Sequence, residues 1–210
     1  QASEVLKYVE VATSTIGDDE VLVKQYASSV NPIDFKMRSG YGRVIFSKKR
    51  GFDLPLVLGR DVSGEVVLVG KSVTSFSIGD RVYGVPAAKA HGAYAEFVVS
   101  KESDITLKPA SLSYAEAASI PYVACTVWDA LVTKSGLTEQ NSKGKKVFVQ
   151  GGSGGIGALA IQVLKAWGAH VATTCSGKHV EAVLALGADV VIDYETQDYA
   201  AMLSNYDVVL

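Results

Sequence analysis

The sequence predicts an α/β protein in two parts, a β-rich first part followed by a doubly wound parallel sheet. Two observations support this division. The first half of the 210 residues contains many short runs of β-branched and aromatic residues separated by polar turns, which is typical of a compact barrel-like fold. From Lys146 onwards, short apolar runs alternate with helical patterns, which indicates β-α-β units with right-handed crossovers.

Five strands are expected in the first part, each an apolar run or an alternation of apolar and polar residues. Turn signals such as Gly79-Asp80 and Lys108-Pro109 separate them, and Asn31-Pro32 is interpreted as a further turn. The expected strands span residues 20–27, 62–69, 81–83, 94–99 and 105–107.

Helical patterns begin after residue 110. Ser113 and Glu116 have the spacing of a capping box, which predicts a short helix that Pro121 interrupts. A second helix is expected over residues 122–135 and should end at Gly136. Beyond it, strands are expected at 147–149, 170–174, 190–192 and 206–210, with helices at 158–167, 178–186 and 196–203 between them.

The chain ends within the expected fourth strand of the parallel sheet, where only the first half of a dinucleotide fold would be complete. We therefore expect a fragment of a longer protein, with trimmed opening residues as well. The expected domains span residues 1–120 and 121–210. Any activity would belong to the longer protein.

A glycine-rich segment lies between the strand at 147–149 and the helix that follows it. Gly152, Gly154 and Gly157 form the pattern G-x-G-x-x-G in the order strand, turn, helix, which is typical of dinucleotide-binding sites. The first glycine is expected to allow the tight turn, the second to let the backbone approach a pyrophosphate, and the third to let helix and strand pack closely. Free N–H groups at the helix start would hold the pyrophosphate. The alternative is a glycine-rich turn in a domain that has lost its ligand.

Residues after the second strand of this sheet favour NADP(H) over NAD(H). An NAD site has a carboxylate about 20 residues beyond the glycines, but none occurs here before Glu181. Ser176 and Lys178 supply a hydroxyl and a cation, which suit a 2′-phosphate, and Tyr194 follows the third strand at the same sheet edge. Each has a simpler alternative, because the serine could cap a helix, the lysine could be solvated and the tyrosine could be a rim residue.

Composition and charge exclude several function classes. The chain is 48% hydrophobic and 20% charged with a net charge of −2, so no polyanion-binding surface and no nucleic-acid partner are expected. No apolar stretch is long enough to span a membrane. The two cysteines, Cys125 and Cys175, suggest a reducing compartment and cannot supply a four-cysteine zinc site.

Several ordered motifs together resemble the medium-chain dehydrogenase/reductase superfamily, in its zinc-free quinone oxidoreductase branch. Besides the glycine turn, these are Asn31-Pro32-Ile33-Asp34, Gly59-Arg60-Asp61-Val62-Ser63-Gly64, Gly79-Asp80-Arg81-Val82 and Gly92-Ala93-Tyr94-Ala95-Glu96. Within that branch, the segments at 37–42, 120–122 and 165–171 are similar to those of the mitochondrial reticulon-interacting oxidoreductases.

The resemblance implies a GroES-like catalytic domain followed by a Rossmann domain, with the active site in the cleft between them. It also implies NADPH as the hydride donor and a quinone or activated enone as the acceptor. A mitochondrial location linked to ubiquinone metabolism, a homodimer and a reticulon-family partner are implied in the same way, with the cytoplasm as the alternative compartment.

The resemblance also implies roles for particular residues. Ser153, Gly155 and Ile156 match the pyrophosphate-binding turn of the family, and Ser176 and Tyr194 match positions near the adenosine 2′-phosphate. Cleft positions near the nicotinamide and the substrate are matched by Asn31 and Thr126.

Zinc is not expected. Related zinc alcohol dehydrogenases have a cysteine near the segment that residues 31–38 occupy here, and Gly-His-Glu where this chain has Gly59-Arg60-Asp61. A catalytic zinc needs three protein ligands, and the histidines are scattered along the chain at positions 91, 170 and 179. Asp34 and Arg60-Asp61 are interpreted instead as structural ion pairs.

Without a metal, hydrogen-bond donors must stabilise the charge that develops on the acceptor oxygen. Asn31 offers an amide donor, and Tyr41 or Lys36 could donate or relay the proton. The alternatives are that Asn31 only forms a turn and that Tyr41 only covers a loop. On the helix near the domain junction, Cys125 and Trp128 are expected in the core.

Two other functions remain open at this stage. Cofactor loops can survive the loss of chemistry, so a non-enzymatic NADPH-binding sensor or scaffold is one alternative. An enoyl-thioester reductase of the same architecture is the other. Oxidation of NADPH upon addition of a quinone would separate an enzyme from a sensor.

Overall fold

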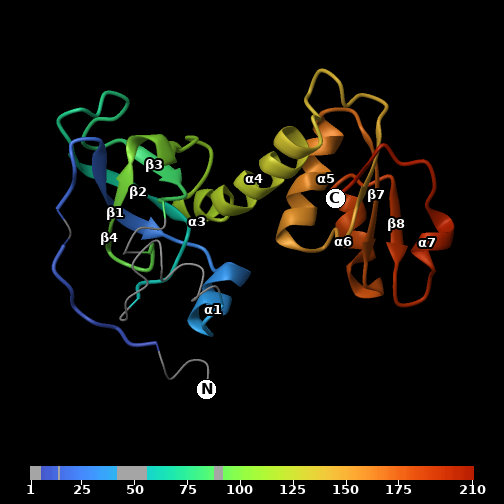
Figure 1. Ribbon diagram of the computed structural model, residues 1–210, viewed down its shortest axis with the longest axis horizontal. Helices are drawn as coiled ribbons and strands as arrows, with labels where there is room; N and C mark the ends of the chain where they lie inside the picture. Colours follow the sequence, from blue (N-terminus) through green and yellow to red (C-terminus); the bar gives the residue numbers. More distant parts are fainter. Residues whose placement is uncertain (1–5, 14, 42–55, 88–91) are drawn as a thin grey trace. The chain divides into compact units, whose positions relative to one another are not determined.

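The structure is a computed structural model that describes residues 6–13, 15–41, 56–87 and 92–210 (Figure 1). The chain divides into two compact units, Gln1–Tyr122 and Val123–Leu210. Each unit is described separately below. Among the residues that the structure describes, no helix has both the length and the hydropathy needed to cross a bilayer.

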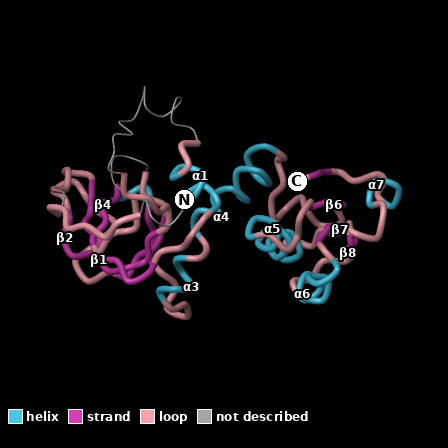
Figure 2. Tube along the Cα trace, turned by 90° about the horizontal axis from the view of Figure 1, so that it is seen from below, coloured by secondary structure: helices cyan, strands magenta, loops and turns pink. Residues whose placement is uncertain are grey.

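The first unit contains a five-stranded antiparallel sheet, seen in magenta in Figure 2. Its strand order is β4-β1-β2-β3-β5, so the first strand lies beside the second and the fourth. The strands span β1 (Glu20–Ala27), β2 (Val62–Val69), β3 (Arg81–Gly84), β4 (Phe97–Lys101) and β5 (Ile105–Leu107). This arrangement confirms the β-rich first part.

Valine dominates the core of this sheet. A cluster of buried residues from all five strands and the adjoining loop joins Val21, Val23, Val62, Val66, Val82, Ala93, Val98 and Ile105. Complete burial of one such side chain stabilises the fold by about 1.5–3 kcal/mol, so the cluster holds the five strands together.

Strand β4 begins three residues later than the sequence predicted. The preceding segment pairs with the loop before β2 instead, because Gly92 N donates to Val57 O at 3.0 Å and Tyr94 N to Leu58 O at 2.8 Å. The side chain of Gln25 in β1 donates to the carbonyl oxygens of Ala93 and Ala95. Backbone pairing with β1 therefore reaches Glu96, whereas residues 92–94 pair with the loop before β2.

A helix that the sequence did not predict, α1 (Pro32–Arg38), follows β1. The dipeptide Asn31-Pro32 starts this helix and is not a separate turn. Asn31 is the N-cap and proline occupies the first helical position, where its missing N–H costs nothing. Asp34 Oδ2 accepts a hydrogen bond from Asn31 N at 2.8 Å, which completes the helix start.

The capping box at Ser113 is confirmed. Ser113 Oγ accepts from Glu116 N at 3.2 Å, and Glu116 Oε2 accepts from Ser113 N at 2.8 Å, at the start of α3 (Tyr114–Ala118). The next helix, α4 (Pro121–Trp128), continues as a π-helical segment, η2 (Asp129–Lys134). The predicted helix over 122–135 is therefore present, but its last turn and a half are wider than an α-helix.

The second unit contains a four-stranded parallel sheet in the order β8-β7-β6-β9, with helices packed against it (Figure 1). The strands are β6 (Lys146–Val149), β7 (His170–Cys175), β8 (Val190–Asp193) and β9 (Val208–Val209). The helices are α5 (Gly155–Ala166), α6 (Val180–Ala185) and α7 (Tyr199–Met202), and a 3-10 turn, η3 (Gly177–His179), precedes α6. This order is the first half of a doubly wound sheet, as predicted.

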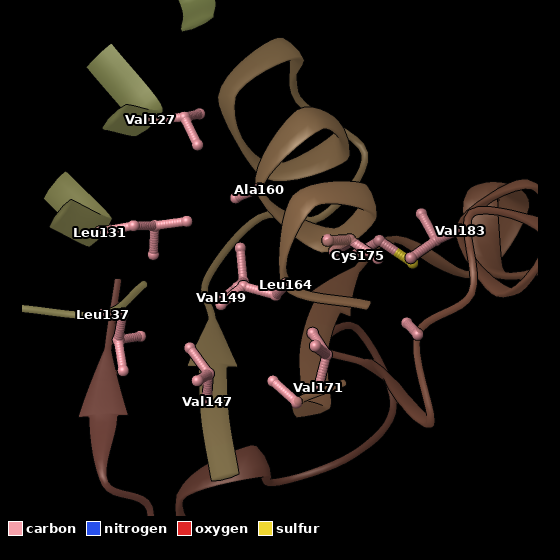
Figure 3. Packing of buried hydrophobic residues seen from close by; sticks show 13 residues of the cluster. Val127, Leu131, Leu137, Val147, Val149, Ala160, Leu164, Val171, Cys175 and Val183 are labelled. Carbon is pink, nitrogen blue, oxygen red and sulfur yellow. The ribbon is translucent and has the colours of Figure 1, made fainter. Parts of the chain in front are cut away.

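The core of this unit lies between the sheet and the helices that pack on it (Figure 3). Val147 and Val149 of β6 face Ala160 and Leu164 of α5, and all four are at most 1% exposed. Buried residues around them include Val127, Leu131, Leu137, Ile161, Val171, Cys175 and Val183. The near-continuous apolar character of β6 follows from burial on both faces of a parallel sheet.

Helix α7 is shorter than predicted. Asp198 Oδ1 accepts from Ala200 N at 3.0 Å, so it caps the helix and sets its start at Tyr199, three residues after the predicted start. Helix α5 differs in the opposite direction and begins at Gly155. Gly155 and Gly157 are therefore part of the helix.

The Asp189 carboxylate links helix α5 to strand β7 in the second unit, and this contact leads to a prediction about pH-dependent stability. Lys165 Nζ lies 2.7 Å from Asp189 Oδ2, and Val171 N donates to the same oxygen at 2.7 Å. Burial alone would raise the pKa of Asp189, but the Lys165 and Val171 hydrogen bonds and the charges of Lys165 and His170 outweigh it and lower the pKa. Both side chains are about one-third exposed, so screening limits the gain to about 1 kcal/mol.

Asp189→Asn should therefore lower the free energy of unfolding by about 1 kcal/mol at neutral pH. Because the folded-state pKa is below the ordinary value, the contribution is complete above that value and is lost as the pH falls through the folded-state pKa. Urea unfolding of both forms between neutral and acidic pH should show curves that converge in acid. A constant difference at all pH values would contradict this explanation.

Candidate functional site

The glycine turn joins β6 to the first turn of α5 and contains five glycines. The sequence suggested that Gly152 allows the tight turn. The left-handed conformation lies instead at Gly151, which has φ +77°. Gly152 is required for space, because a Cβ built on it would overlap Thr173 Oγ1 and would lie 2.9 Å from Ile161 Cδ1. The Thr173 hydroxyl is held by its hydrogen bond to Val149 O. At Gly157 a Cβ would lie 2.8 Å from Gly152 Cα, which is the close helix–strand approach expected of the third glycine.

Two glycines of the turn are not required by packing within the protein. A Cβ at Gly154 would meet nothing nearer than 3.4 Å, and one at Gly155 nothing nearer than 3.6 Å. Side chains would therefore fit here without a ligand. The free space above the turn is what a closely approaching pyrophosphate would occupy.

The turn also presents unsatisfied donors. The main-chain N–H groups of Ser153, Gly155 and Ile156 make no hydrogen bond within the described part of the chain. They lie at the start of α5, a helix of 12 residues whose dipole places partial positive charge at this end. Donors of this kind at a helix N-terminus suit an anionic group such as a pyrophosphate.

The strand ends next to the turn carry the residues expected to contact the adenosine phosphate. Gly152 N donates to Thr174 O at 2.8 Å, so the turn lies directly beside the end of β7. Ser176 follows that strand, is 7% exposed and makes no side-chain hydrogen bond in the described residues. Lys178 is exposed in the following turn. Tyr194 follows β8, the neighbouring strand, with 53% of its surface exposed.

A carboxylate that sequence reasoning missed lies close to this group. Asp193 ends β8, and a Cβ on Gly177 would lie 2.8 Å from its Oδ2. Its oxygens accept hydrogen bonds from Glu195 N at 3.0 Å and Thr196 Oγ1 at 3.1 Å. Burial, and then the charge of Asp193, raise the pKa of the Cys175 thiol. The absence of an acid in the sequence before Glu181 therefore does not make the region free of negative charge.

On helix α4, the exposure of Cys125 and Trp128 corrects the expectation that both lie in the core. Val127 is 2% exposed and belongs to the core of the second unit. Cys125 is exposed and Trp128 is 59% exposed, so neither is the core residue that the sequence suggested. Trp128 instead contacts Trp167 edge to face, with ring centroids 6.3 Å apart. Thr126, the expected nicotinamide-side contact, is exposed on the same helix.

In the first unit, Asn31 is buried and held by two neighbours. It is 5% exposed, and its Nδ2 donates to Ser29 Oγ at 2.9 Å and to Asp61 Oδ2 at 2.7 Å. Ser29 Oγ also hydrogen bonds to Asp61 Oδ2. The amide is thus an ordered group, in a network that includes a carboxylate.

The two buried aspartates of this region are structural, but they are not ion-paired in the part of the chain described here. Asp34 is 2% exposed and accepts hydrogen bonds from Asn31 N at 2.8 Å and Gly59 N at 3.2 Å. Asp61 is 1% exposed and accepts from Tyr122 N at 2.7 Å as well as from the residues named above. Neutral donors therefore take the place of the ion pairs expected from sequence.

Lys36 and Tyr41 lie close together at the end of α1. The Lys36 ammonium lies 5.8 Å from the centre of the Tyr41 ring, within the range of a cation–π contact. Tyr41 is 63% exposed, and Lys36 is also exposed. Both can therefore reach a ligand or solvent.

Tyr94 is a further polar residue of this region, for which the sequence predicted no role beyond its place in a motif. Its hydroxyl lies 3.1 Å from Ser29 O and 3.1 Å from Asp34 Oδ2. Burial, followed by the charge and hydrogen bond of Asp34, raises the pKa of the phenol well above its usual value. The signal that could have found it is the aromatic residue at the centre of Gly92-Ala93-Tyr94-Ala95-Glu96.

Arg60 lies between these aspartates in the sequence and packs on an aromatic ring. Its guanidinium carbon is 5.9 Å from the centre of the Tyr122 ring. In the described residues no group of three or more His, Cys, Asp or Glu side chains could hold a metal ion. The polar groups around Arg60 therefore make hydrogen bonds to Asp61, and the Arg60 guanidinium itself makes a cation–π contact.

A parallel sheet with this glycine turn at a helix N-terminus defines the class of dinucleotide-binding folds, and here a β-rich unit precedes it. Two family models match the chain: "Alcohol dehydrogenase GroES-like domain" over residues 17–110 and "Zinc-binding dehydrogenase" over residues 155–210. The chain belongs to the medium-chain dehydrogenase/reductase superfamily.

Relatives within the superfamily agree. The chain is 44% identical over 221 residues to "NAD(P)H oxidoreductase RTN4IP1, mitochondrial" of Danio rerio, covering 99% of this chain and 57% of the relative. A quinone oxidoreductase from Coxiella burnetii superposes with a TM-score of 0.87 at 34% identity, covering 100% of this chain and 65% of that one. Escherichia coli quinone oxidoreductase complexed with NADPH gives 0.80 at 28% identity, covering 97% and 59%. The chain thus spans little more than half of that Danio rerio relative.

Proposed function

We propose that the full-length protein transfers hydride from NADPH to a quinone or an activated enone without zinc. The observation that carries this proposal is the glycine turn. Three of its N–H groups have no partner among the described residues, and the space beside Gly154 and Gly155 is not filled by other atoms of the protein. A nicotinamide cofactor is supported by the oxidoreductase relatives, one of which is named as a complex with NADPH. The choice of NADPH and of the acceptor is our inference.

In this proposal the second unit binds the adenosine side of the cofactor. Ser153, Gly155 and Ile156 would donate their N–H groups to the pyrophosphate, while Gly154 leaves room for it. The 2′-phosphate would be bound by Ser176, Lys178 and Tyr194. The unpartnered Ser176 hydroxyl supports this role, and the Lys178 ammonium offsets the nearby charge of Asp193.

The first unit would supply the groups that act on the acceptor. When bound, the cofactor supplies a hydride, and negative charge develops on the acceptor oxygen. In this proposal Ser29 Oγ and Asp61 Oδ2, which hydrogen bond to each other, share one N–H bond of Asn31 Nδ2. The second N–H is left for the acceptor oxygen. Lys36 or Tyr41 would then deliver the proton, since both are exposed and mutually close.

The proposal of a zinc-free reaction is supported by the side chains at positions 60 and 61. Position 60 carries a guanidinium, which cannot bind a cation. The carboxylate of Asp61 is occupied by the hydrogen bonds of Ser29, Asn31 and Tyr122. A conjugated acceptor needs less stabilisation than an isolated ketone, which suits a site without a Lewis acid.

Location and partners are proposed by similarity alone. The Danio rerio relative is named as mitochondrial, which supports a mitochondrial location. A link to ubiquinone metabolism, a reticulon-family partner and a homodimer are proposed from the family resemblance alone. Fractionation of cells that express the full-length protein would test the compartment directly.

The function is tested by comparing NADPH and NADH oxidation by the full-length protein with a soluble benzoquinone. We expect NADPH to be preferred, and Ser176→Asp to weaken NADPH binding by about 100-fold by placing a carboxylate where the 2′-phosphate binds. NADH binding should change by less than about threefold. Ser176→Ala is the matched control, since it removes the hydroxyl without adding charge and should cost about 10-fold at most.

The possible results separate the alternatives. Equal use of NADH by the unmodified protein would show that Ser176 and Lys178 do not select the phosphate. NADPH binding without turnover on quinones or enones would favour the sensor or scaffold function. Turnover that depends on added zinc would contradict the zinc-free mechanism.

A further inference from the structure

Asp61 connects three segments of the first unit. It lies directly before β2 and is 1% exposed. Its Oδ2 accepts from Ser29 Oγ and from Asn31 Nδ2, its Oδ1 accepts from Tyr122 N at 2.7 Å, and its main-chain oxygen accepts from Ser28 Oγ at 2.7 Å. One carboxylate therefore joins the loop after β1, the start of β2 and the start of α4.

The carboxylate also determines which way the Asn31 amide faces. A carboxylate can only accept hydrogen bonds, so the NH₂ group of Asn31 must be the end that faces Asp61. The two ends of an amide differ in chemistry, one being a donor and the other an acceptor. Asp61 thus fixes which end of the Asn31 amide is the donor end, and in the proposed function one N–H bond of that end contacts the acceptor oxygen.

The same carboxylate supplies a cap that α4 lacks. The helix begins at Pro121 and is preceded by Ile120, whose side chain cannot accept a hydrogen bond, and its first turn contains no acidic residue. Tyr122 N would be an orphan donor there, but Asp61 Oδ1 accepts it. The position of the Asn31 loop is thereby tied to the first turn of α4.

We propose that Asp61 is a positioning residue. It orients the Asn31 amide so that an N–H faces the oxygen of the quinone or enone, and it holds the Asn31 loop against the first turn of α4. This proposal rests on the proposed function, in which Asn31 contacts the acceptor oxygen. It makes a prediction about hydrogen-bond polarity that no purely space-filling role would make.

A swap of donor and acceptor between the two positions tests it. In Asp61→Asn only one side-chain oxygen remains at position 61. Where it keeps the hydrogen bond from the main-chain N–H of Tyr122, the new NH₂ group faces the NH₂ of Asn31, so the Asn31 amide must rotate to present its oxygen. In Asn31→Asp, two buried carboxylates face each other and repel. The double variant Asn31→Asp/Asp61→Asn restores a donor opposite an acceptor and keeps the total charge, so every hydrogen bond of the network can form again.

In the full-length protein we expect Asp61→Asn to reduce kcat with benzoquinone by about 100-fold, because the amide is misoriented, while the Kd for NADPH changes by less than about threefold. Asn31→Asp should show the largest decrease in Tm. The double variant should recover at least about half of that decrease, but not kcat, since position 31 then lacks an N–H. This recovery of stability without turnover is the signature of positioning.

The matched control is Asp104→Asn, which removes a carboxylate that accepts a hydrogen bond from Ala87 N at 3.0 Å elsewhere in the same unit. It should leave kcat within about twofold. The proposal is overturned if Asp61→Asn keeps kcat within threefold of the unmodified protein well below its Tm, or if the double variant is no more stable than Asn31→Asp. If the unmodified protein reduces no quinone or enone, the proposed function fails, whereas the Tm comparison still decides whether Asp61 orients Asn31.

Discussion

Gly157→Ala should abolish measurable NADPH binding and destabilise the second unit by about 3 kcal/mol. The added Cβ would lie 2.8 Å from Gly152 Cα, and its neighbours are main-chain atoms of the turn that cannot move aside as a flexible side chain would. Helix α5 would have to shift away from the turn, and the N–H groups of Ser153, Gly155 and Ile156 would lose their common direction. Urea unfolding and NADPH titration of the full-length protein measure the two effects.

Gly155→Ala is the matched control, and it should separate binding from stability. Its Cβ would meet only Val123 Cγ2 at 3.6 Å, an ordinary contact, and alanine is the better helix former, so stability should stay the same or rise by about 0.5 kcal/mol. NADPH binding should still weaken by at least about 10-fold, since the methyl group enters the space proposed for the pyrophosphate. Unchanged binding in Gly155→Ala would show that the pyrophosphate does not lie over this turn.

The features that the sequence predicted correctly are local ones. Strands β1, β2 and β5 have the predicted bounds, because each is a short apolar pattern closed by turn residues. The glycine turn was recognisable because strand, glycines and helix follow one another within about 20 residues. In both cases a few neighbouring residues contain the whole signal.

The features that the sequence did not predict depend on residues far apart in the chain. Asp61 is linked to Asn31, 30 positions away, and to Tyr122, 61 positions away. The Asp193 carboxylate lies beside Gly177 because β7 and β8 are neighbours in the sheet. No spacing rule brings these residues together, since each contact depends on which strands pair and in what register.

Helix α1 is a different kind of failure, because its signals are local and were present. Asn31, Pro32 and Asp34 are good N-cap, N1 and N3 residues, but a helix of 7 residues is too short for a clear apolar period. The same dipeptide is a common turn, and the turn was the simpler interpretation. The N3 carboxylate is the residue that distinguishes a helix start from a turn here.

That carboxylate gives the second prediction of large effect: Asp34→Ala should destabilise the first unit by about 3 kcal/mol. The substitution removes the acceptor for Asn31 N at 2.8 Å and for Gly59 N at 3.2 Å, in a region where Asp34 is 2% exposed. A buried donor left without a partner costs about 1–3 kcal/mol, and two are created here. Tyr94 keeps Ser29 O as a partner, so its hydroxyl adds little. Asp80→Ala, which removes a half-buried carboxylate that accepts a hydrogen bond from Ser77 N near the surface, is the control and should cost less than about 1 kcal/mol.

A titration of Tyr94 distinguishes loss of this network from general loosening of the fold. Burial, then the charge and hydrogen bond of Asp34, raise the pKa of Tyr94, so its proton is held more tightly in the folded than in the unfolded state. Stability linked to this proton is complete below the unfolded pKa of about 10 and is lost as the pH rises through the folded-state pKa. In Asp34→Asn, which keeps the shape but removes the charge, the pKa of Tyr94 should fall although burial remains. Tyrosinate absorbance, with Tyr94→Phe to assign the signal, measures this shift. A pKa of Tyr94 that is the same in Asp34→Asn would show that the Asp34 carboxylate does not act on the phenol, and that burial and the charge of Asp61 cause the rise.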